Sequence, residues 1–112
     1  MPGGVKREGW NVNSEELPGR LLQLAARLYA ETDGFEQHSE DGQLWYNRGY
    51  ANGMLAGLSE LGHTEAIRTA GITPDPDDIA ADQALLPWGQ AYTHGYEVGY
   101  RETREVLGDD RK

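Results

Sequence analysis

Side chains that could bind a metal are scattered along this chain of 112 residues. The three histidines, His38, His63 and His94, lie far apart, and none stands four residues from a second metal ligand on a predicted helix. Metal centres need several ligands that converge on one point. This distribution is more typical of surface or helix-capping histidines, so we expect no metal site.

Catalytic motifs are equally sparse. The run of residues 36–41 has oxygen and nitrogen donors for a weak divalent site but lacks the glycine-centred spacing of a calcium loop. No serine lies in a nucleophile elbow, and the glycines follow helical spacing rather than that of a phosphate-binding loop. Paired carboxylates occur by chance in a small acidic protein. We therefore expect neither an enzyme nor a cofactor.

The formal net charge of -9 is concentrated in two acidic clusters, and no Lys or Arg occurs from Thr69 to Tyr100. An acidic surface repels nucleic acid but suits a larger protein with a basic surface. The alternative is that both clusters are solvated loops and helix starts. The candidate partner-binding residues are Glu31, Asp33, Glu36, Glu40 and Asp41 in the first cluster, and Asp75, Asp77, Asp78 and Asp82 in the second.

A pattern of tyrosines and glycines occurs twice, 46 residues apart, on predicted helices 42–61 and 88–107. Each glycine costs a helix interior about 1 kcal/mol, so a neighbouring element should fill the groove that the glycines leave. We expect the two repeats to pack on each other as an antiparallel pair with a local two-fold axis and interleaved tyrosine rings. The alternative is a homodimer interface in the same groove. The candidate packing residues are Tyr46, Gly49, Tyr50, Gly53 and Gly57 in the first copy, and Tyr92, Gly95, Tyr96 and Gly99 in the second.

The remaining elements predict an all-α fold, a compact bundle of about five helices, three of them long. An irregular arm, 1–12, precedes a single helical domain, 13–112. The first helix begins after Asn13 or at Pro18 and ends near Thr32. Its apolar stripe comprises Leu17, Leu21, Leu24 and Leu28 and is widened by Leu22, Ala25 and Tyr29. After an acidic connector, 33–41, the next cap signals occur at three positions. Asp41 should cap the first repeat helix, Thr64 a short helix 65–70, and Asp75 with Pro76 a helix 76–86.

The last helix carries a row of aromatic residues, Trp88, Tyr92, Tyr96 and Tyr100, spaced four residues apart. Tyrosine and tryptophan have polar tips, which suit half-buried positions and interfaces. We interpret the row as the core face of this helix, and a binding ridge is the alternative.

Compartment and membrane association follow from composition. The chain has no cysteine, no run of about 18 apolar residues, and no apolar segment after Met1 that would indicate a signal peptide. We therefore expect a cytoplasmic protein that does not enter a membrane. Either a monomer or a homodimer is compatible with this sequence.

Two classes of function remain. A small, single-domain, cysteine-free, acidic helical chain without a catalytic motif resembles the inhibitors that phages and mobile elements encode against host defence, including anti-CRISPR proteins. That resemblance implies a protein that binds and blocks a basic, nucleic-acid-binding surface of a larger protein. The chain is also somewhat similar to small Gly-x-x-x-Gly helical adaptors of maturation complexes, which implies a groove that holds a partner helix.

Overall fold

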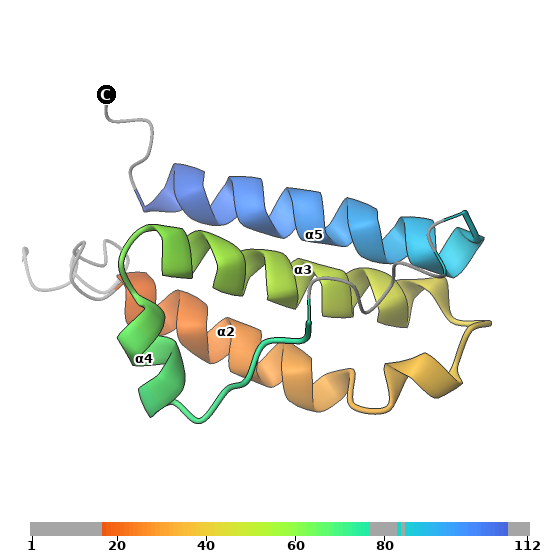
Figure 1. The fold of residues 1–112 in the computed structure, drawn as a ribbon, viewed down its shortest axis with the longest axis horizontal. Helices are drawn as coiled ribbons and strands as arrows, with labels where there is room; N and C mark the ends of the chain where they lie inside the picture. Colours follow the sequence, from red (N-terminus) through yellow and green to blue (C-terminus); the bar gives the residue numbers. More distant parts are fainter. Residues whose placement is uncertain (1–16, 77–82, 84, 108–112) are drawn as a thin grey trace, which may run out of the picture.

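The described part of the chain is a bundle of helices. A computed structural model describes residues 17–76, 83 and 85–107. They form α2 (Leu17–Glu31), the 3-10 helix η1 (Phe35–Gln37), α3 (Gly42–Glu60), α4 (Thr64–Thr69) and α5 (Pro87–Val106), as Figure 1 shows. No strand occurs in these ranges, so the all-α prediction is confirmed. The predicted arm 1–12 and most of the predicted helix 76–86 lie outside the described residues.

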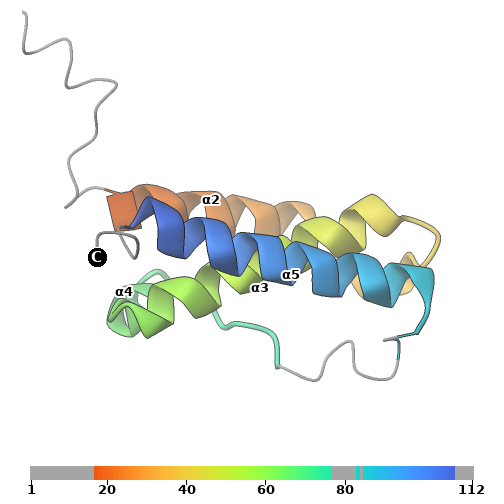
Figure 2. The ribbon, with the colours of Figure 1, turned by 90° about the horizontal axis from the view of Figure 1, so that it is seen from above.

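The two repeat-bearing helices, α3 and α5, lie side by side and run in the same direction (Figures 1 and 2). The expected antiparallel arrangement is therefore wrong. After α3 the chain turns through α4, and residues 72–76 run back along the bundle. α5 starts at the same end of the bundle as α3.

Helix boundaries follow the cap signals in part. The Asp41 carboxylate accepts a hydrogen bond of 3.1 Å from the Leu44 amide, so the predicted N-cap of α3 is confirmed. The predicted cap at Thr64 is wrong, because α4 already includes that residue and His63 is its N-cap. The Thr64 hydroxyl instead lies 2.6 Å from the Ser59 hydroxyl, which ties α4 to the end of α3.

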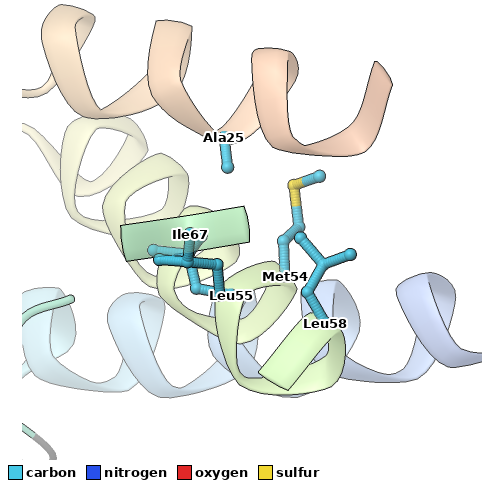
Figure 3. Packing of buried hydrophobic residues seen from close by; sticks show 5 residues of the cluster. All are labelled: Ala25, Met54, Leu55, Leu58 and Ile67. Atoms are coloured by element: carbon cyan, nitrogen blue, oxygen red, sulfur yellow. The ribbon is translucent and has the colours of Figure 1, made fainter. Parts of the chain in front are cut away.

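One part of the core lies where α2, the second half of α3 and α4 meet. Figure 3 shows its buried members, which are Ala25, Met54, Leu55, Leu58 and Ile67. On α2 the fully buried position is Ala25, whereas Leu24 of the predicted stripe is 37% exposed. The small Ala25 side chain lets α2 approach α3, while Leu21, Leu22 and Leu28 pack around it. The buried face therefore lies within the predicted stripe and is centred on Ala25, with Leu24 at its exposed edge.

A second part of the core lies at the other end of the bundle, where the acidic connector meets α3 and α5. Phe35 is buried against the edge of Trp45, with ring centroids 4.9 Å apart, and stacks on Tyr92 at 6.1 Å. The Trp45 indole donates a hydrogen bond of 3.2 Å to the His38 carbonyl. The connector is therefore attached to the core by a buried ring, which its acidic composition did not suggest.

Candidate interaction surface

The seam between α3 and α5 is formed by main chain against main chain. A Cβ on Gly49 would lie 2.0 Å from the Tyr92 carbonyl oxygen, and one on Gly95 would lie 2.2 Å from the Tyr46 carbonyl oxygen. The two repeats are 46 residues apart, so Gly95 corresponds to Gly49 and Tyr92 corresponds to Tyr46. Each copy therefore makes with the other the same contact that it receives. Gly53 meets Tyr96, and Gly99 meets Tyr50, in the same reciprocal manner. The repeats are thus related by a local two-fold axis, and no side chain fits in the seam at these positions.

The sequence suggested that tyrosine rings fill the glycine grooves. The structure shows that they do not. The atoms nearest to Gly49, Gly53, Gly95 and Gly99 belong to the tyrosine main chain, and those nearest to Gly57 belong to the Thr103 side chain. The Tyr46 and Tyr50 rings stack on each other at 6.4 Å, and the Tyr46 ring meets His94 edge-on at 5.6 Å. The Tyr50 hydroxyl donates a hydrogen bond to Glu102, and burial together with this bond raises the pKa of Tyr50 to about 12. The groove is therefore closed from within the chain, and the rings flank it.

The aromatic row of α5 turns from core to surface along the helix. Tyr92 is buried, whereas Trp88, Tyr96 and Tyr100 are half-buried. The Tyr100 hydroxyl donates a hydrogen bond of 2.6 Å to Glu60 of α3. The row is thus part of the α3–α5 packing at its start and a cross-helix polar contact at its end.

Asp75 is engaged inside the protein. Its carboxylate accepts hydrogen bonds from Arg48 through Nε at 2.7 Å and Nη2 at 3.3 Å. The two side chains are only 11% and 13% exposed. Arg48 also donates to the Thr32 hydroxyl and to the Tyr29 carbonyl, and its guanidinium lies 3.8 Å from the centre of the Tyr29 ring. Asp75 therefore fastens the returning segment 72–76 to α2 and α3. Most of the helix that Asp75 was predicted to cap lies outside the described residues.

Asn52 completes this polar network. Its amide nitrogen donates to Asp75 at 2.8 Å and to the Tyr92 hydroxyl at 3.0 Å. Its amide oxygen accepts from the Tyr29 hydroxyl and from the Asp75 amide. Burial raises the pKa of Tyr29 to about 12 and raises that of Tyr92 as well. Burial also disfavours the charged Arg48, but the hydrogen bonds and charge of Asp75 outweigh this effect, so the pKa of Arg48 is raised.

The first acidic cluster has the opposite character. All five of its members, Glu31, Asp33, Glu36, Glu40 and Asp41, are exposed around η1 at one end of the bundle. We call these five residues the acidic surface. Among the described residues its one ion pair joins Glu40 to His38 at 3.4 Å, a contact that is charged only when the histidine is protonated. The Arg48 guanidinium lies 5.0 Å from the centre of the Phe35 ring, but it is paired with Asp75. The acidic surface is therefore left without a lysine or arginine counter-charge in the described part of the chain.

The structure divides the predicted partner-binding residues into three groups. All five residues of the acidic surface are exposed, whereas Asp75 is turned inward. Asp77, Asp78 and Asp82 lie outside the described residues. Sequence reasoning missed the inner network, although one signal was present. Arg48 and Asn52 stand four residues apart on a helix whose other central residues are mostly glycine, alanine, methionine and leucine. Such a polar pair on an otherwise apolar face indicates a buried, paired charge.

Other chemistry in the described ranges is limited. No group of three His, Asp or Glu side chains within them could hold a metal ion. An open cavity of about 400 Å³ lies between α3, α4 and residues 72–74, with Leu55, Ile67 and Ile72 in its lining. Its one charged side chain, Arg68, is paired with Glu65. None of the described helices is both long enough and apolar enough to span a membrane.

Comparison with known proteins identifies no relative: no protein-family model, curated protein or solved structure matches this chain. Function therefore has to be inferred from the chain's own residues.

Proposed function

We propose that this protein is a non-enzymatic inhibitor that binds a basic, nucleic-acid-binding surface of a larger protein and blocks it. Inhibitors of this kind are encoded by phages and mobile elements against host defence, and anti-CRISPR proteins are examples. The observation that supports the proposal most is the exposure of all five carboxylates of the acidic surface at one end of the bundle. Clustered charge of one sign speeds association with an oppositely charged surface and excludes like-charged partners.

The acidic surface is also held in place, which favours binding. Phe35 attaches η1 to the core, and the Trp45 indole holds the His38 carbonyl. A segment that is ordered before binding loses less conformational entropy when a partner arrives. The carboxylates are therefore presented by a supported turn rather than by a free chain.

The adaptor function is less well supported, because the glycine groove is occupied. An adaptor of that kind would hold a partner helix in the glycine groove, and the glycines would have to be accessible. Gly49, Gly53, Gly57, Gly95 and Gly99 are all buried between α3 and α5. A partner helix could enter this groove only if α5 left it. The buried glycines therefore do not support the adaptor function.

Two matched triple variants test the proposal. Glu31→Gln/Glu36→Gln/Glu40→Gln removes three charges from the acidic surface, and Glu65→Gln/Glu97→Gln/Glu105→Gln removes three exposed charges elsewhere. Both would be titrated against purified, guide-loaded CRISPR effector complexes while binding of labelled target DNA is measured. We expect the wild-type protein to compete with DNA for at least one effector. The first variant should associate more slowly and with a weaker salt dependence, and the second should behave like the wild type.

Three results would contradict the proposal. The wild-type protein could fail to compete with DNA on every effector tested. The two triple variants could lose inhibition equally, which would indicate a general effect of net charge. Binding could also persist at about 1 M salt, where screening acts within about 3 Å. In that case the contact would have to be apolar rather than electrostatic.

A further inference from the structure

Two leucines at the same end of the bundle as the acidic surface are exposed to solvent. Leu85 is 88% exposed and Leu86 is 39% exposed, immediately before α5 begins. The other large apolar side chains that are exposed in the described ranges, Leu24 and Val106, reach 37% and 48%. Burial of a leucine side chain is worth about 1.5–3 kcal/mol, so an almost fully exposed leucine on a held turn is a strong candidate for a contact residue.

The turn that carries Leu85 is fixed against the start of α5. The Leu86 amide donates a hydrogen bond of 2.9 Å to the Gln83 carbonyl, and the Trp88 indole donates one of 2.9 Å to the Gln83 side chain. Gly89 lies so close to Gln83 that a Cβ on it would be 1.8 Å from the Gln83 carbonyl oxygen. The exposed leucine is therefore presented by a packed turn.

Two tryptophans connect this turn to the acidic surface. The Trp88 ring lies 6.5 Å from the Trp45 ring, and Trp45 in turn donates to the His38 carbonyl of the connector. Figures 1 and 2 both place the start of α5 and the connector at the same end of the bundle. The exposed leucines and the exposed carboxylates thus lie at the same end of the bundle.

We propose that Leu85 and Leu86 are an apolar anchor for a basic protein segment that carries a large apolar side chain among its arginines or lysines. This inference rests on the proposed function and narrows its partner. Charge complementarity selects the occupant, because the leucines lie at the same end of the bundle as carboxylates that have no lysine or arginine counter-charge in the described ranges. A second copy of this chain would bring the same carboxylates and a net charge of -9, so it is disfavoured. Charge would then set the rate of association, and the leucines would set the rate of dissociation.

Two synthetic peptides with equal numbers of arginines test this anchor. In one the arginines alternate with leucine, and in the other with serine. Affinity for each is measured by fluorescence anisotropy for the wild type, for Leu85→Ser, and for Val106→Ser as an exposed apolar control on the far end of α5. We expect Leu85→Ser to weaken binding of the leucine peptide about 10-fold and to leave the serine peptide unchanged. Val106→Ser should change neither affinity.

The triple variant Glu31→Gln/Glu36→Gln/Glu40→Gln separates this inference from the proposed function. It should weaken both peptides. If it does so while Leu85→Ser binds the leucine peptide like the wild type, the anchor is refuted and the electrostatic function stands. If it weakens neither peptide, the proposed function fails and the anchor fails with it. A wild-type dimer in sedimentation equilibrium that Leu85→Ser abolishes would overturn the proposal in favour of a second copy.

Discussion

Gly53 of α3 lies directly against the main chain of Tyr96 of α5, so that a Cβ on Gly53 would be 2.1 Å from the Tyr96 carbonyl oxygen. The repeat-related Gly99 has the same relation to Tyr50, at 2.2 Å. Side-chain atoms do not approach carbonyl oxygens so closely, so the two helices can keep this separation only with glycine at both positions. The price in helix propensity is offset by the close packing of two long helices.

Gly53→Ala should therefore destabilise the protein although alanine favours helix. The propensity gain is about 1 kcal/mol, but the methyl group forces α3 and α5 apart, and we expect a net loss of about 2 kcal/mol or more in the free energy of unfolding. Chemical denaturation measures it. The control is Gly19→Ala in α2, where a Cβ meets nothing within 4 Å, and a gain of about 0.5–1 kcal/mol is expected. A Gly53→Ala protein as stable as the wild type would contradict the close contact.

Asp75→Asn should destabilise far more than neutralising a surface acid. It leaves the nearly buried Arg48 charge without its partner, which costs about 3 kcal/mol. The control is Glu65→Gln, which breaks the exposed pair with Arg68 and should cost less than about 1 kcal/mol. Urea unfolding curves compare the two. The double variant Arg48→Met/Asp75→Asn should recover part of the lost stability. Equal losses for Asp75→Asn and Glu65→Gln would show that the Arg48–Asp75 pair is solvated.

Tyr29 and Tyr50 should ionise late in an alkaline titration. Their pKa values are raised to about 12, whereas phenols in the unfolded chain ionise near pH 10. Between these values the unfolded state binds fewer protons than the native state, so the free energy of unfolding falls as pH rises from about 10 to about 12. Below pH 10 these groups should have no effect. Tyrosinate absorbance of the folded protein measures the titration, and Tyr50→Phe should remove one late step. Ionisation of every tyrosine near pH 10 with the helices intact would argue against this burial.

Asp41 has two separable properties, its charge and its cap. Asp41→Asn removes the charge but retains an oxygen for the Leu44 amide, whereas Asp41→Ala removes both. We expect Asp41→Ala to cost about 1 kcal/mol and Asp41→Asn only a few tenths. Thermal melts of the two variants at equal ionic strength decide this. Equal losses would mean that the carboxylate acts through its charge on the helix dipole instead.

Interactions between residues close in sequence determined where the helices form. The spacing of tyrosine and glycine at three and four residues defines one helical face, and this information is present without knowledge of any neighbour. The same holds for Asp41, whose carboxylate can reach only the first free amides of α3, and for the need of the bare glycine face to be filled. These features depend on residues within one or two turns of each other, so the sequence alone predicted them.

Contacts between distant residues were decided only by the tertiary structure. The glycine spacing is satisfied by either helix direction, and only the tertiary structure places α3 and α5 parallel. Composition placed Phe35 in an acidic connector and Asp75 in an acidic cluster. The aromatic pocket of Trp45 and Tyr92 buried the first, and the guanidinium of Arg48 drew in the second. Which carboxylates stay on the surface depends on where the counter-charges lie in space. The spacing of residues along the chain does not give these positions.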